Sequence, residues 1–179
     1  MLIQFFKELN LDLDRFANKS RIKSKVFALL TVQGAWAVFV YRFGNISYQR
    51  SKRNKLYLFN IFVWYILNKI VEIIAGISID YRATIGKRLF ISHFGNIFVS
   101  ARAILGDDCN LSQGVTIGHG SGGYPVIENN VYIGAGAIIN GNINIGENSK
   151  IGSLASVVKS FPKNSTIVGN PAINKAKNG

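Results

Sequence analysis

A six-residue period decides the fold of this chain. It is cleanest over residues 127–157, which read IENNVYIGAGAIINGNINIGENSKIGSLASV. Chance spacing is a poor explanation for so many positions in phase, and the frequent Gly, Ile and Val disfavour a helix. Such a hexapeptide repeat is typical of a triangular β-helix, in which each repeat forms one short strand and one corner. The branched aliphatic residues that we expect to point into the prism here are Ile127, Ile133, Ile139, Ile145, Ile151 and Val157.

The same period extends upstream with two changes of phase. It runs from Ile79 to Ile97 and shifts by two residues, then runs from Leu105 to Ile117 and shifts by four. We place the first insertion around residues 100–104. The second falls in residues 118–126, reading GHGSGGYPV, which we expect to leave the prism as a loop. With the pattern broken at Phe161, the repeat predicts a mainly β protein, a parallel β-helix of a little over four coils over residues 77–173.

Residues 1–76 are predicted to form a basic, aromatic helical region, and residues 174–179 a short tail. Apolar spacing indicates helices over residues 2–16, 26–41 and 56–75, with Gly44 ending the second apolar segment. The third segment is about long enough to cross a bilayer. It contains Lys69 and Glu72, however, and each charge costs roughly 2.5–3.5 kcal/mol in a bilayer core. We therefore expect no transmembrane helix.

Charge and cysteine content narrow the partners and the compartment. The net charge is +12, of which residues 1–75 carry +8, mostly in two basic runs at 19–25 and 50–55. Such runs fit a solvated face, an anionic membrane surface or nucleic acid, but no nucleic-acid motif accompanies them and we expect no nucleic-acid partner. Cys109 is the only cysteine, which excludes an internal disulfide and a cysteine metal cluster. With no signal peptide visible, we expect a cytoplasmic protein, with the inner face of the cytoplasmic membrane as an alternative.

Three stretches resemble a known family. They read IGKRLFISHFGNIFVS (85–100), DDCNLSQGVTIG (107–118) and IGAGAIINGNINIGENSKIG (133–152), followed by VGNPA (168–172). Residues 30–173 resemble the hexapeptide-repeat acyltransferases of the serine acetyltransferase-like branch, and most of all the colanic-acid and capsule polysaccharide O-acetyltransferases. The resemblance implies a left-handed β-helix that forms homotrimers and binds acetyl-CoA, the acyl donor, in the groove between adjacent prisms. It assigns contacts with CoA to Gly118, Ala135, Ser153, Lys159 and Pro171.

His93 is the predicted general base. A serine or sugar hydroxyl is a poor nucleophile at neutral pH, and imidazole titrates in the range suited to removing its proton. The matching histidine of the family has this role. In serine acetyltransferases an aspartate orients that histidine, but here Ser78 and Ser92 stand where that branch has acids. Asp80 faces the same way as Ser78 in a strand, so it is the candidate substitute; a backbone carbonyl is the alternative.

The loop residues His119 and Tyr124 are predicted to contact the acceptor, and so is Asp80. The simpler interpretation of His119 is a solvated loop residue, and the alternative is a contact with the acceptor or with pantetheine. Gly123 and Tyr124 replace a basic residue and a histidine that hold the amino acid in serine acetyltransferases, which leaves no cation in the loop to bind a carboxylate. Tyr124 could stack on a sugar, so the leading expectation is a carbohydrate acceptor.

Three functional hypotheses follow. The first is an acetyl-CoA-dependent O-acetyltransferase that acts on a surface polysaccharide or its lipid-linked precursor, held at the membrane by its basic helices. The second is a serine O-acetyltransferase of cysteine biosynthesis, and the third an inactive β-helix scaffold. We expect no metal, because the zinc enzymes built on β-helices need three histidine ligands and this chain contains two histidines.

Overall fold

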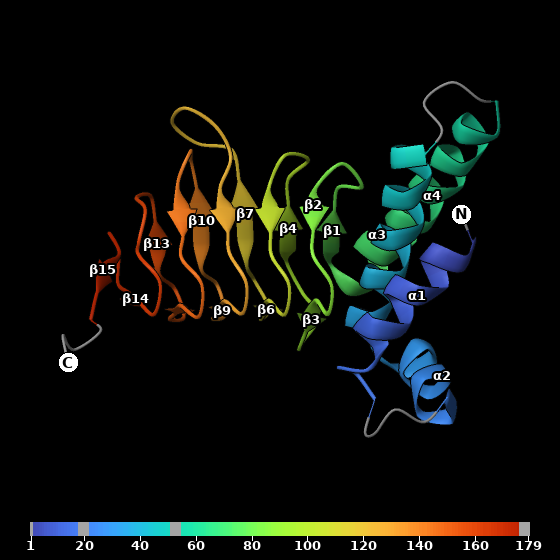
Figure 1. Ribbon diagram of the computed structural model, residues 1–179, viewed down its shortest axis with the longest axis horizontal. Coiled ribbons are helices and arrows are strands. Elements are labelled where there is room, and N and C mark those ends of the chain that lie inside the picture. Colours follow the sequence, from blue (N-terminus) through green and yellow to red (C-terminus); the bar gives the residue numbers. More distant parts are fainter. Residues whose placement is uncertain (1, 18–21, 51–54, 176–179) are drawn as a thin grey trace.

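The protein is a prism of short strands with four helices packed on its N-terminal end (Figure 1). The structure, a computed structural model, describes residues 2–17, 22–50 and 55–175. Parts of the two predicted basic runs, residues 19–21 and 51–54, and most of the predicted tail, residues 176–179, lie outside the described residues. The helices are α1 (Leu2–Leu13), α2 (Ile22–Thr31), α3 (Gln33–Arg50) and α4 (Lys55–Ala75).

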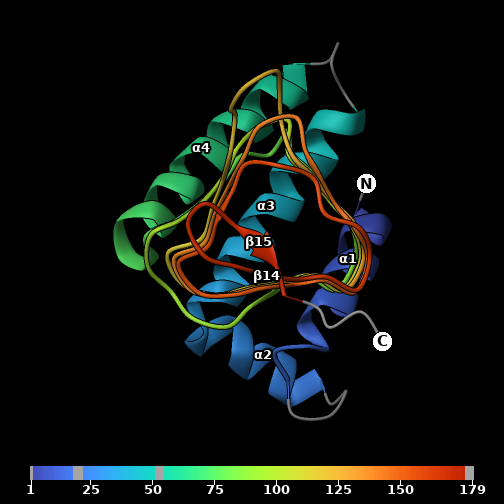
Figure 2. The same cartoon turned by 90° about the vertical axis from the view of Figure 1, so that its left-hand side faces the viewer.

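The strands form three parallel sheets that make the three faces of the prism, so the coils superpose as a rounded triangle when viewed along it (Figure 2). Sheet A contains β1 (Ile77–Ile79), β4 (Ile97–Val99), β7 (Thr116–Gly118), β10 (Ile138–Asn140) and β13 (Ser156–Val157). Sheet B contains β2 (Thr84–Ile85), β5 (Ile104–Leu105), β8 (Val126–Ile127) and β11 (Asn144–Ile145). Sheet C contains β3 (Phe90–Ile91), β6 (Asn110–Leu111), β9 (Tyr132–Ile133), β12 (Lys150–Ile151), β14 (Thr166–Val168) and the antiparallel β15 (Ile173–Asn174).

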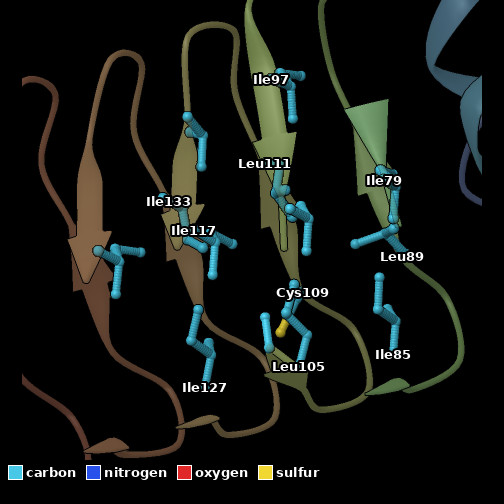
Figure 3. Close-up of a cluster of buried hydrophobic side chains, with 14 of the residues drawn as sticks. Ile79, Ile85, Leu89, Ile97, Leu105, Cys109, Leu111, Ile117, Ile127 and Ile133 are labelled. Carbon is cyan, nitrogen blue, oxygen red and sulfur yellow. The ribbon is translucent and has the colours of Figure 1, made fainter. Parts of the chain in front are cut away.

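The predicted aliphatic positions fill the prism interior, where they stack coil upon coil (Figure 3). From Ile127 to Val157, all six in-phase residues are at most 1 % exposed. The β-helix is therefore confirmed, and it has about five coils. The six-residue phase is interrupted at Phe161, four residues after Val157, but the stack continues beyond it: the Phe161 side chain is buried, its backbone bridges to Ile145, and Ile167 follows six residues later.

The first insertion lies elsewhere than the spacing predicts. Val99, and not Ile97, is the register partner of Ile79 and of Ile117. The two extra residues therefore fall between Ile91 and Val99, in the corner that contains His93, and not around residues 100–104. Spacing alone was misleading because β4 points two aliphatic residues inward, so either could be counted as the repeat position.

The helices are joined to the first coil by buried polar side chains of α1 and α3. Arg42 donates hydrogen bonds to the carbonyls of Ile85, at 2.8 Å, and of Gly86. Its Nε also donates to Asp12 at 2.8 Å, and Asp12 accepts the backbone N–H of Leu89 at 3.1 Å. These contacts satisfy backbone groups that would otherwise be left unpaired at the end of the prism. Removing one partner of such a buried ion pair typically costs about 3–5 kcal/mol.

Helix α3 continues through Gly44 to Arg50, so the expectation that the second apolar segment ends at Gly44 is wrong. A Cβ on Gly44 would lie 2.3 Å from Cδ1 of Trp64 in α4. Glycine is present because it lets α3 and α4 approach closely, and not because the helix stops there.

By length and composition alone, residues Tyr57–Ala75 of α4 could cross a membrane. In the structure α4 packs against α3 and β1, and it leaves an apolar stripe on its outer side, including Phe62, Ile66 and Ile73. The expectation that α4 does not span a bilayer stays a prediction. The hypotheses of a membrane-surface contact and of a cytoplasmic location also stay predictions.

Candidate active site

The predicted site residues lie along the two edges of one face, sheet A. One edge is the His93 corner, residues 92–96, which joins β3 to β4. The opposite edge carries the loop of residues 119–125, which extends from the prism after β7 (Figure 1); we call it the loop edge. At about 3.3 Å per residue, the stretch of β4 from Asn96 to Ser100 spans roughly 13 Å. A small acceptor could not touch both edges of the same prism.

The His93 corner is held by its backbone. The N–H of Gly95 donates to the carbonyl of Ala75 at 2.8 Å, and the N–H of Ile97 donates to the carbonyl of Gly76 at 3.0 Å. Gly95 has a φ of 104° and Asn96 a φ of 52°, both in the left-handed region of backbone conformation. The side chain of His93 is exposed, as expected for a base that must reach a substrate.

The residues predicted to contact CoA are divided between the two edges. Ala135 and Ser153 stand in the corners stacked beyond the His93 corner, where the N–H of Leu154 donates to the carbonyl of Ala135 at 2.8 Å. Gly118 and Lys159 are on the opposite edge, at or after the ends of β7 and β13. Pro171 lies past β14, near the C-terminal end of the prism. Their contact with CoA stays a prediction.

A cleft of about 460 Å³ separates α4 from sheet A, and we call it the α4 cleft. It brings together the three residues predicted to contact the acceptor, Asp80, His119 and Tyr124, and adds Glu72, Ser78 and Arg82. His93 does not line it. The rings of His119 and Tyr124 are 5.0 Å apart, and the guanidinium of Arg102 lies 5.8 Å from the Tyr124 ring centroid.

The α4 cleft contains two cations that come from outside the loop. Arg82 pairs with Asp80 through Nη2 and Oδ2 at 2.7 Å, and Lys69 pairs with Glu72. The loop itself carries neither cation: Arg82 follows β1 and Lys69 belongs to α4. About half of each cationic side chain is exposed, so both can reach a ligand.

Asp80 is hydrogen-bonded to Arg82, and not to His93 as the sequence led us to expect. Its carboxylate accepts the Arg82 backbone N–H at 2.8 Å and the guanidinium Nε at 2.9 Å, in addition to the ion pair. The Asp80 side chain thus makes its described hydrogen bonds with Arg82 and none with His93. The carboxylate hydrogen-bonded to Ser78, the position where related sequences carry an acid, is Glu72, at 2.6 Å.

Glu72 is a site residue that sequence reasoning missed. Partial burial would raise the pKa of Glu72, but hydrogen bonds from Lys69 and Ser78 and the charge of Lys69 outweigh burial and lower the pKa below its ordinary value. The signal was present as an i, i+3 pair of Lys69 and Glu72 inside an apolar helix. Its significance depends on the packing of α4 beside β1, which no local pattern reveals. Among the described residues, no group of three or more His, Cys, Asp or Glu could hold a metal ion.

Comparisons with known proteins point to one enzyme family. The model of the bacterial transferase hexapeptide family (six repeats) matches residues 124–159. A serine acetyltransferase of Bacillus pumilus is 33% identical over 181 residues, covering 98% of this chain and 79% of the relative. The crystal structure of a Neisseria gonorrhoeae serine acetyltransferase in complex with serine superposes with a TM-score of 0.81 at 29% identity, covering 97% of this chain and 70% of that one. A Brucella abortus serine acetyltransferase in complex with coenzyme A has a TM-score of 0.81 at 28% identity, covering 99% and 70%.

These relatives overturn the leading expectation for the acceptor. The sequence led us to expect a polysaccharide O-acetyltransferase, with Tyr124 against a sugar. The matches to serine acetyltransferases over nearly the whole chain favour the second hypothesis, and they do not support a carbohydrate acceptor. The error came from treating the loop as the whole acceptor site, whereas the cations of the α4 cleft come from other elements.

Proposed function

Because the chain is an acyltransferase that belongs to the serine acetyltransferase family, we propose that it transfers the acetyl group of acetyl-CoA to the hydroxyl of L-serine. The observation that carries this acceptor is the pairing of charges in the α4 cleft. Two carboxylates and two cations line one small cleft, so its formal charge is balanced while both signs are available. A zwitterionic amino acid matches that arrangement, and an uncharged sugar makes no use of it.

His93 provides the base for the reaction; because His93 does not line the α4 cleft of its own prism, serine bound there is met by the partner subunit's His93. Its imidazole removes the proton of the serine hydroxyl as the oxygen attacks the thioester carbonyl. The C–O bond forms, the C–S bond breaks, and the imidazolium returns the proton to the departing CoA sulfur. The exposure of His93, at a corner held rigidly by its backbone, suits a base that meets two substrates in turn.

We further propose that the enzyme works as a homotrimer, the assembly typical of hexapeptide-repeat transferases. The residues expected to contact CoA lie on opposite edges of sheet A, with Ala135 and Ser153 on one and Gly118 and Lys159 on the other. One CoA molecule can meet both sets only in a groove between two prisms. In such a groove Lys159 would offset phosphate charge, and small residues would let pantetheine lie against the backbone.

The proposal is tested by mixing the purified protein with acetyl-CoA and L-serine. CoA thiol release and the mass of the product are followed, with the oligosaccharides of surface polysaccharides as alternative acceptors. We expect serine-dependent release and O-acetylserine as the product. Release that depends on an oligosaccharide and not on serine would contradict the proposal, as would thiol release that no acceptor stimulates.

A further inference from the structure

Glu72 lies in the α4 cleft with an acceptor position left open. Its Oε1 accepts hydrogen bonds from Asn68 Nδ2 at 2.7 Å and from Ser78 Oγ at 2.6 Å, while Oε2 accepts Lys69 Nζ. A carboxylate offers about four lone-pair positions, two on each oxygen. Three of them are occupied, so Oε2 can still accept one donor. About a fifth of the side chain is exposed, toward the cleft that it lines.

The other carboxylate of the cleft is already neutralised by a two-point ion pair with a guanidinium. Asp80 already accepts three hydrogen bonds from Arg82, at 2.7–2.9 Å. Among the described residues that line the cleft, Glu72 and Asp80 are the two acidic side chains. Glu72 receives only one bond from a cation, that of the half-exposed Lys69, whereas Arg82 gives Asp80 two guanidinium bonds. A cationic group of a ligand is therefore best accepted by Glu72, and the remaining N–H groups of Arg82 can donate to an anionic group.

The spacing of these two charges suits a small zwitterion. Ser78 of β1 bonds Glu72, and Asp80, two residues further along and directly after β1, bonds Arg82, so the two charged groups are held over backbone positions about 7 Å apart. A hydroxyl also stands beside them: Ser100 Oγ is buried, lines the cleft and has no hydrogen-bond partner within the described part of the chain. Buried polar groups without partners are uncommon in proteins, and a bound ligand is one means of satisfying them.

We infer that Glu72 binds the ammonium group of the acceptor, so that helix α4 supplies the group that selects an ammonium-bearing acceptor over other hydroxyl compounds. This inference rests on the proposed function and adds the residue that determines its substrate class. Lys69 keeps the empty site neutral. Its ammonium, on a half-exposed side chain, shares Oε2 with the ammonium of the substrate or moves aside for it.

The test is steady-state kinetics of Glu72→Gln with L-serine as the varied substrate. Gln keeps the shape and an acceptor oxygen for Asn68 and Ser78, but it loses the charge. Loss of a charged hydrogen bond predicts a rise in the KM for serine of about 10- to 100-fold. The kcat and the KM for acetyl-CoA should remain within about threefold of wild type, because neither His93 nor the CoA groove is touched. L-glycerate, which lacks the ammonium, should inhibit the variant and the wild type equally.

Glu147→Gln is the matched control, because it makes the same chemical change at an exposed glutamate outside the cleft. It should leave every constant unchanged. Thermal unfolding shows whether Glu72→Gln folds. Should it not fold, Glu72→Asp, which keeps the charge but withdraws it by one methylene, should raise the KM for serine by a smaller factor, about threefold.

The outcomes separate this inference from the proposed function. Serine acetylation by the wild type with an unchanged KM in Glu72→Gln would overturn the role of Glu72 and leave the function standing. If the wild type ignores serine but acetylates another hydroxyl compound with an ammonium group, such as ethanolamine or homoserine, and Glu72→Gln loses that preference, the role of Glu72 stands and the function falls. Acetylation of no ammonium-bearing acceptor would overturn both.

Discussion

The His93 corner, before β4, and the loop edge, after the neighbouring strand β7, lie on opposite edges of sheet A and are built by different means. The His93 corner is placed by backbone: two inserted residues, two positive φ angles and hydrogen bonds to Ala75 and Gly76. The α4 cleft, which extends to the loop edge, is built by side chains from four separate parts of the chain: α4, β1 with the turn after it, β4 with the turn after it, and the loop after β7. The proposed base thus belongs to the repeat, whereas much of the proposed acceptor site belongs to the contact between repeat and helix.

This difference predicts that chemistry and acceptor recognition can be damaged separately. A β-helix keeps its coils in register over its whole length, so a corner residue is held whatever packs on the prism end. A cleft formed between two elements depends on both of them. Changes at the His93 corner should therefore reduce kcat, and changes in the α4 cleft should raise the KM for serine.

The largest expected effect comes from His93→Ala. Loss of a general base should lower kcat about 10²- to 10⁴-fold. The KM for serine should stay near that of wild type, because His93 does not line the α4 cleft. The matched control is His119→Ala, the other histidine, which lies at the loop edge and should keep kcat within about tenfold. Equal losses of kcat in the two variants would mean that His119 contributes to the chemical step as much as His93 does. That result would contradict separate roles for the two edges.

Arg82→Gln should have the next largest effect, and it should change the KM for serine instead of kcat. The guanidinium is proposed to hold the carboxylate of serine, so its loss should raise the KM for serine about 10- to 100-fold, with kcat little changed. Arg88→Gln removes an arginine that is also paired with an aspartate, but at a corner away from the cleft, and serves as control. A fall in kcat with an unchanged KM for serine would mean that Arg82 acts in the chemical step and not in binding serine.

Gly95→Ala tests whether backbone geometry holds the His93 corner. The φ of 104° disfavours any side chain, although a Cβ there would meet no atom within 4 Å. The strain should cost about 1–3 kcal/mol of the free energy of unfolding and, by displacing His93, lower kcat about tenfold. Gly122→Ala, at a φ of 79° in the loop, should be strained in the same way without lowering kcat. Urea unfolding and kinetics of both variants measure the two effects.

The smallest predicted effect is the acid dependence contributed by Glu72. Because the pKa of Glu72 is lowered in the folded protein, its charge stabilises the fold above its ordinary pKa of 4.5, and that stabilisation is lost as the pH falls below it. The difference in unfolding free energy between wild type and Glu72→Gln should be about 1 kcal/mol or less at pH 7, because the group is partly solvated. It should shrink toward pH 3. A difference that grows with acid would mean that the carboxylate is destabilised in the fold.

The sequence predicted the prism well because its core depends on a period of six that every coil must obey. The inward positions from Ile127 to Val157 could be assigned one by one, and His93 was located on an exposed corner. The first insertion was misplaced because Ile97 and Val99 both point inward. The Lys69–Glu72 pair was noticed, but only as an obstacle to membrane insertion. Its place beside Ser78 depends on the angle at which α4 meets the prism, which has no local sequence signal.

The most direct test of the proposed acceptor site compares three acceptors that differ in the charged groups they carry. L-serine, ethanolamine and L-glycerate each offer a primary hydroxyl, but ethanolamine lacks the carboxylate and glycerate lacks the ammonium. With acetyl-CoA saturating, we expect a kcat/KM for serine at least about tenfold higher than for either analogue. Ethanolamine leaves Arg82 without a carboxylate, and glycerate leaves Glu72 without an ammonium. Equal values of kcat/KM for the three acceptors, or a preference for glycerate, would contradict the proposed site.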